Sequence, residues 1–221
     1  MEVNEWTTIP RTKNKKKYFK EVRKSRNNGI ESLENMIEEG LNRMELIETM
    51  SVSLKNCHFV VSLESALRNV DISPTILLVG GIGHVYSNWN SIYQLCLVLL
   101  LNEIFKFDQI FLFDPNFVED DLAILSSLQL SCSPLPLPPL STIVDEEEDV
   151  LVFLPHVPLG VLEVSSGVVG VIGNSSQMED ELKLELEDWK EERIEVESGG
   201  RLEKAFNSLS YYSPSIGELI S

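Results

Sequence analysis

The chain has 221 residues, of which 43% are hydrophobic and 24% are charged, and this composition excludes a wholly disordered, collagen-like or fibrous protein. Its net charge of −17 disfavours binding of nucleic acid or anionic lipid over most of the surface. Three cysteines without CxxC or Cys/His spacing predict neither a disulfide framework nor a metal site. We therefore expect one α/β domain with charged arms in a reducing compartment, the cytoplasm or the nucleus.

Residues 1–29 are polar, and nine of the 18 basic residues lie between Arg11 and Arg26. We expect a flexible basic arm. Its charge is typical either of a nuclear-localisation or polyanion-binding patch or of a solubilising tail. The first residues are acidic and lack an apolar run, so neither a signal peptide nor a transit peptide is expected.

Residues 30–56 repeat an apolar residue every three or four positions, as at Leu33, Ile37, Leu41 and Met44. This spacing predicts an amphipathic helix packed on the core, and a partner-binding helix is the alternative. A second helix is predicted near residues 63–70. The α/β domain is expected over residues 57–178, followed by an acidic C-terminal segment, 179–221. A solvated helix and a strand are expected within residues 178–197.

Short apolar strands and helical patterns alternate along the middle of the chain. The predicted strands are 76–79, 109–113, 130–133, 150–154 and 168–172, and the predicted helices are 92–101, 119–128 and 159–166. This alternation predicts a Rossmann-like parallel sheet with right-handed crossovers and helices on both faces. The apolar stretch 150–173 is interrupted by prolines and glycines, so no transmembrane helix is expected.

Unusual polar residues stand where the predicted strands end. Gly81 and Gly83 follow the first strand, Asp114 the second, and Asn174 and Ser175 the last. Ligands of parallel α/β sheets bind at this edge, where glycines let them approach the backbone and an acidic residue accepts hydrogen bonds from a ribose. The pattern predicts an adenosyl or nucleotide site, although a GGIG turn without the full GxGxxG also occurs as a mere tight turn, and no Walker lysine follows it.

Two of the three histidines, His84 and His156, also lie at predicted strand ends. They are the candidate catalytic residues, through binding or proton transfer, and a structural hydrogen-bonding role is the alternative. Metal ligation would need Asp114 as a third ligand without any known metal spacing, so no metal is expected. A Gly-x-Ser-x-Gly elbow is absent from the sequence.

Five motifs in order resemble the sensitivity-to-red-light-reduced (SRR-like) domain family. They are residues 80–83 (GGIG), 93–95 (YQL), 113–117 (FDPNF), 153–156 (FLPH) and 172–175 (IGNS), and the similarity covers about residues 60–180. The chain resembles a divergent member, because His84 stands where the family commonly has Ser and Val157 where it commonly has Cys. A thiol or metal role drawn from that Cys is therefore not expected here.

The resemblance implies a regulatory protein that acts through protein partners. The family is associated with circadian timing and light signalling, with cytoskeletal processes and with haem metabolism, so haem is a ligand that only the resemblance implies. The alternative function is an enzyme with a Rossmann-like pocket that transfers a group from an adenosyl cofactor. The glycines and Asp114 favour this alternative, whereas the charged arms and the lack of a complete catalytic motif favour the regulator.

Overall fold

A computed structural model describes residues 31–69, 72–139, 142–143, 148–156, 167–174, 189–196, 201–206 and 209–214, with the backbone alone at 31–42, 174 and 201–202. It divides into two units, residues 1–42 and 43–221, and the sheet and the site belong to the second unit. The predicted basic arm and the predicted helix at 159–166 lie outside the described residues.

Helices and strands alternate through the second unit much as the sequence predicts. The elements are α2 (Glu31–Leu54), α3 (His58–Asn69), β1 (Ile76–Gly80), α4 (Trp89–Phe105), β2 (Gln109–Phe113), α5 (Glu119–Ser127), β3 (Ser131–Ser133), β4 (Val150–Leu154), β5 (Val168–Asn174), β6 (Trp189–Arg193), α6 (Arg201–Ala205) and β7 (Leu209–Pro214). The sequence analysis does not predict α6 or β7. No helix among the described residues combines the length and the apolar character needed to cross a membrane.

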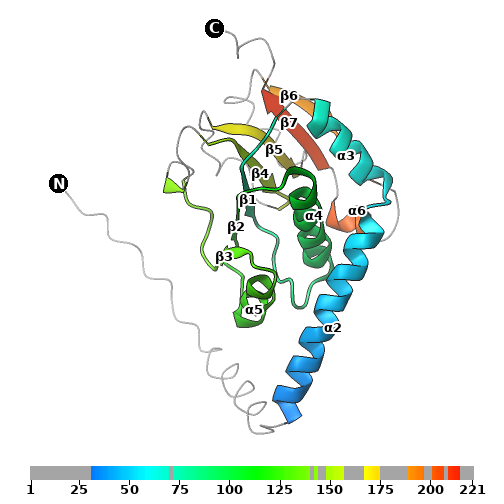
Figure 1. Ribbon diagram of the computed structural model, residues 1–221, viewed down its shortest axis with the longest axis vertical. Helices are drawn as coiled ribbons and strands as arrows, with labels where there is room; N and C mark the ends of the chain where they lie inside the picture. The colour runs from blue at the N-terminus through cyan, green and yellow to red at the C-terminus, as the bar shows by residue number, and fades with distance from the viewer. Residues whose placement is uncertain are drawn as a thin grey trace, which may run out of the picture. The chain divides into compact units, whose positions relative to one another are not determined.

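The strands form one seven-stranded sheet in the order β3-β2-β1-β4-β5-β7-β6. The pairs from β3 to β5 are parallel, and β1 lies between β2 and β4, which confirms the expected α/β class and parallel core. The last two pairs differ from the expectation, because β7 runs antiparallel to both β5 and β6. The structure is thus a mixed sheet, with its antiparallel part at one end (Figure 1).

Alternate residues of each central strand point to opposite faces of the sheet, as the pleat requires. On one face Leu77, Val79, Leu151 and Phe153 join the buried residues of the helices in the larger core cluster. On the other face Ile76, Leu78 and the remaining residues of β4 form a smaller cluster with Leu137, Ile143 and Trp189. Both faces are therefore buried, which explains the continuous apolar runs of β1 and β4.

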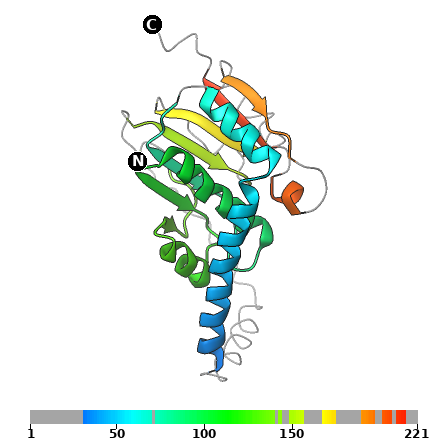
Figure 2. The same cartoon turned by 45° about the vertical axis from the view of Figure 1, so that its right-hand side comes forward.

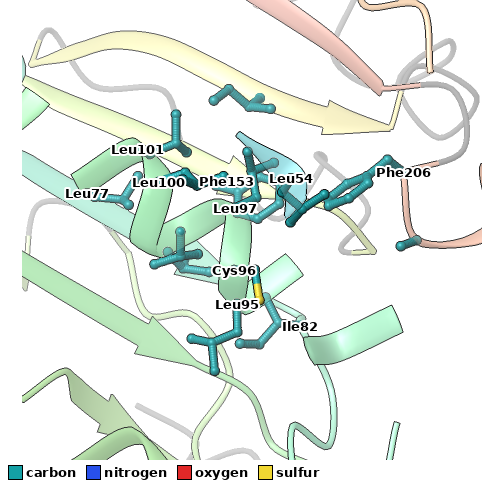
Figure 3. Close-up of a cluster of buried hydrophobic side chains, with 14 of the residues drawn as sticks. Leu54, Leu77, Ile82, Leu95, Cys96, Leu97, Leu100, Leu101, Phe153 and Phe206 are labelled. Carbon is teal, nitrogen blue, oxygen red and sulfur yellow. The ribbon is translucent and has the colours of Figure 1, made fainter. Parts of the chain in front are cut away.

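Helix α4 is buried on nearly every side, with nine buried positions along its length. It lies beside the strands with α3 nearby, as the two views of the ribbon show (Figures 1 and 2). Leu97 and Leu100 of α4 lie in one buried cluster with Leu77 and Phe153 of the sheet and Leu54 of α2 (Figure 3). Rotation of such a helix about its axis would expose apolar side chains to solvent. Packing therefore fixes the rotation of α4 and the position of its N-terminus beside β1.

A glycine in β5 makes room for an aromatic ring of β7. A Cβ built at Gly170 would lie 2.7 Å from Cε2 of Tyr211 and 3.1 Å from Cδ1 of Leu151. Tyr211 is among the largest fully buried side chains, so its ring has no free space to move into.

We expect Gly170→Ala to lower the free energy of unfolding by about 1–3 kcal/mol, the usual cost of overpacking a core. Urea denaturation of the variant measures this loss. Tyr211→Leu should remove the clash, so the double variant should show a coupling free energy between the two sites. Strictly additive losses in this double-mutant cycle would contradict the proposed contact.

Candidate ligand-binding site

The strand order reverses direction at β1, which pairs with β2 on one side and with β4 on the other. Loops that leave the carboxyl ends of such strands diverge and leave a crevice where ligands bind in α/β proteins. A cavity of about 340 Å³ lies at this edge. It is lined by residues of the loops after β1, β2 and β4 and of the first turn of α4: Gly81, Ile82, Gly83, Asn88, Asn90, Ser91, Asp114, Pro115, Asn116 and His156.

The glycine turn after β1 uses conformations that favour glycine. Gly81 and Gly83 have φ angles of 72° and 73°, a region that side-chain-bearing residues rarely adopt. A Cβ at Gly83 would also stand 3.0 Å from Oγ of Ser91 on α4. Between the two glycines, Ile82 is buried against α4 and fastens the turn to the core (Figure 3).

Asp114 ties the end of β2 to this turn. Its carboxylate is buried and accepts hydrogen bonds from the backbone N–H of Gly83 at 2.6 Å and of Asn116 at 2.8 Å, one on each oxygen. A carboxylate has about four lone-pair positions, so two remain for a further donor. Asp114 is thus a structural link, and among the described residues it is the only acidic one that lines the cavity.

His156 follows β4 and meets a buried amide of α4. Nε2 of Gln94 lies 2.8 Å from Nε2 of His156 and 2.8 Å from the carbonyl oxygen of Ala205. His156 keeps part of its surface exposed to solvent, and the partial burial of its imidazole lowers the pKa of His156 below its usual value. The charge of Asp114 acts in the opposite direction without cancelling the effect. His156 is therefore mostly neutral at pH 7.

His84 makes a different contact. Its Nδ1 lies 3.0 Å from Oδ2 of Asp121, a fully buried carboxylate on α5. Asp121 also accepts hydrogen bonds from the backbone N–H of Tyr86 at 2.8 Å and of Val118 at 3.0 Å. His84 thus helps to attach the loop after the glycine turn to the start of α5, and it is not among the residues lining the cavity.

The structure brings four of the sequence-predicted site residues to one cavity: Gly81, Gly83, Asp114 and His156. Asn174 is the last residue of β5, its side chain is not described, and Ser175 lies outside the described residues. The described part of the chain contains no group of three or more His, Cys, Asp or Glu residues able to hold a metal ion.

Sequence reasoning assigns no role to Asn88, Asn90, Ser91, Asn116 or Gln94. Asn88 is the N-cap of α4, and its side chain accepts a hydrogen bond from the N–H of Asn90 at 2.9 Å. That cap follows a common sequence signature, an Asn just before an apolar helix. Gln94 carries a weaker signal, since it is a lone amide at the start of an apolar run and must find a polar partner when buried.

A known protein family matches the part of the chain that forms the sheet and the cavity. The SRR1 domain family matches residues 59–213, a span that contains β1 to β6, all but the last residue of β7, and every described residue that lines the cavity. The chain therefore belongs to the SRR1 domain family. Neither a curated protein nor a solved structure matches it significantly.

We expect Asp114→Asn to lower the free energy of unfolding by about 1–3 kcal/mol, because an amide has one oxygen and its NH₂ would face a backbone N–H. Chemical denaturation measures the change. Asp108→Asn, at an exposed position, is the matched control and should stay within about 0.5 kcal/mol of the wild type. Equal stability of both variants would show that the two hydrogen bonds to Asp114 contribute little.

The lowered pKa of His156 predicts a pH dependence of stability. The unfolded chain takes up a proton on this residue near the ordinary pKa of 6.5, whereas the folded chain takes it up only at lower pH. Between these two values the unfolded state binds more protons, so stability is lost as the pH falls below about 6.5. Unfolding free energies of the wild type and of His156→Gln, measured over this range, should converge or cross as the pH falls. Parallel profiles would contradict the expected shift.

Proposed function

We propose that this SRR1-domain chain binds a small adenosyl ligand in the cavity beside β1 and β4. The observation that carries the proposal is the glycine turn with two positive φ angles, linked to a buried carboxylate at the end of the next strand. Glycines at such a turn let a ligand approach the backbone, and an acidic residue at that strand end accepts hydrogen bonds from ribose hydroxyls in dinucleotide-binding folds. The carboxylate keeps lone pairs beyond those that accept the two backbone hydrogen bonds, and Asp114 lines the cavity, so it can also accept a hydrogen bond from a ligand.

The charges around the cavity favour an adenosyl group over a nucleotide. Among the described residues, those that line it include one carboxylate and no lysine or arginine. Phosphate groups are usually bound by such cations or by a glycine-rich loop followed by a lysine. A neutral nucleoside or a cationic sulfonium compound, such as S-adenosylmethionine, suits this lining better than a nucleoside triphosphate.

The size of the cavity supports the same class of ligand. Its volume of about 340 Å³ is near the lower end of the usual range for small-molecule sites, about 300–1,000 Å³. This is room for one nucleoside-sized group and disfavours a dinucleotide held entirely within the cavity.

At the level of the cell, we propose a regulatory protein that works with protein partners in the cytoplasm or the nucleus. The resemblance to the SRR-like family implies a regulatory role in processes such as circadian or light signalling, cytoskeletal control or haem-related control, and the family match over residues 59–213 supports that resemblance. The net charge of −17 supports partners other than nucleic acid. In this role the adenosyl ligand acts as a signal that the SRR1 domain detects.

An enzyme that transfers a group from the adenosyl ligand is the second candidate. The observation that favours it is the cavity itself, where Gly81, Gly83 and Asp114 lie at the carboxyl edge of a mainly parallel sheet, the place where α/β enzymes bind their cofactors. A sensor and a transferase differ in one measurable respect, since only the transferase converts S-adenosylmethionine to S-adenosylhomocysteine when a nucleophile is present.

Isothermal titration calorimetry with S-adenosylmethionine, S-adenosylhomocysteine, adenosine and ATP tests the binding proposal. We expect the three compounds without phosphate to bind more tightly than ATP, by about tenfold or more, because ATP would place its phosphates beside Asp114. Asp114→Asn should weaken binding of adenosine after correction for any unfolded fraction, and Asp108→Asn should not.

Two results would overturn the proposal. The first is the absence of heat for all four compounds at millimolar concentration. The second is tighter binding of ATP than of adenosine, because the cavity would then recognise phosphates through residues that this interpretation does not include.

A further inference from the structure

The contacts of Gln94 determine the protonation state of its neighbour. The carbonyl oxygen of Ala205 accepts hydrogen bonds and cannot donate, so the amide atom 2.8 Å away from it must be the NH₂ group. The same NH₂ group lies 2.8 Å from Nε2 of His156. Because an amide NH₂ only donates, Nε2 of His156 must present its lone pair.

The hydrogen of the neutral imidazole is then on Nδ1. The tautomer with the hydrogen on Nε2, and the imidazolium, would each place two donors face to face at 2.8 Å. Since Nε2 is occupied by Gln94, the Nδ1–H group is the one polar group of this ring that remains for a ligand. His156 therefore lines the cavity as a donor, beside Asp114 as an acceptor.

Gln94 is a polar residue in an apolar part of the core, where burial of its amide is unfavourable. The side chain of Gln94 is completely buried, and the residue directly precedes the apolar run 95–101 of α4. Its Oε1 atom is buried without a hydrogen-bond partner among the described residues. A methionine of similar shape would fill the same volume without an unpaired acceptor, so packing alone does not account for a glutamine here.

We propose that Gln94 is a positioning residue, which holds His156 as the neutral tautomer with its hydrogen on Nδ1 so that the ring donates a hydrogen bond to the ligand. The orientation is anchored from outside the loop, because Ala205 belongs to α6 and Gln94 to the rigid helix α4. The pair His156 and Asp114 offers one donor and one acceptor. A hydroxyl group, which both donates and accepts, is complementary to such a pair.

The claim about the tautomer rests on hydrogen-bond geometry, and the claim about the ligand rests on the proposed adenosyl site. Nitrogen NMR of the full chain labelled with ¹⁵N-histidine separates the two claims. The three histidines, His58, His84 and His156, give few signals, and His156→Gln identifies the one of interest. At pH 7.5 the wild type should show a protonated Nδ1 and an unprotonated Nε2 for His156.

Gln94→Met keeps the shape of the side chain and removes the donor. We expect the His156 signals to move toward a mixture of both tautomers, and the affinity for adenosine to fall by about 5–10-fold, as for the loss of one oriented hydrogen bond. Gln109→Met, at an exposed position at the start of β2, is the matched control and should change neither quantity.

The outcomes are distinguishable. A wild-type spectrum with a protonated Nε2 on His156 overturns the positioning role whether or not the variant folds. Unchanged tautomer and affinity in a folded Gln94→Met variant also overturn it. If the wild type shows the expected tautomer but binds none of the adenosyl compounds, the positioning role of Gln94 stands and the proposed adenosyl ligand is wrong.

Discussion

The hydrogen bonds accepted by Asp114 are the constraint on which the geometry of this edge of the sheet depends. One carboxylate oxygen holds the N–H of Gly83 and the other holds the N–H of Asn116, so two loops from neighbouring strands share a single buried charge. A buried carboxylate that lost either donor would leave part of its charge uncompensated, which is costly in a poorly solvated place. The turn after β1 and the turn after β2 are therefore expected to move together or not at all.

Helix α4 supplies the second fixed reference. Because it is apolar on nearly every side, packing fixes its rotation, and with it the direction of the two residues through which it serves the site. Ser91 stands against Gly83, and Gln94 stands between His156 and Ala205. The same helix thus sets the shape of the glycine turn and the chemical state of the histidine opposite it.

The central part of the fold follows from local sequence signals. Apolar runs that stop at glycine or at Asp-Pro are enough to predict β1, β2 and β4, because these strands are buried on both faces and need no alternation. The antiparallel β7 is different. Its residues, 209–214, mix Ser, Tyr and Pro, and its direction depends on pairing with β5, which lies far away in the sequence. Local periodicity contains no information on that pairing.

The site shows the same division. Gly81, Gly83 and Asp114 can be predicted because strand ends in a parallel sheet converge on one edge. The partners of the histidines cannot, since each depends on the register of a helix. His84 turns to Asp121 on α5, whereas His156 turns to Gln94, and nothing in the spacing of the chain distinguishes the two. The structure places one histidine in the support of a loop and the other in the lining of the cavity, although the two occupy similar positions in the sequence.

The charge of the chain and the charge of the cavity lining have the same effect on a phosphate-bearing ligand. The net charge of −17 repels phosphates at long range, and the carboxylate of Asp114 repels them at contact. In the proposed adenosyl site, the charge of the whole chain and the lining of the cavity would therefore both disfavour nucleoside triphosphates.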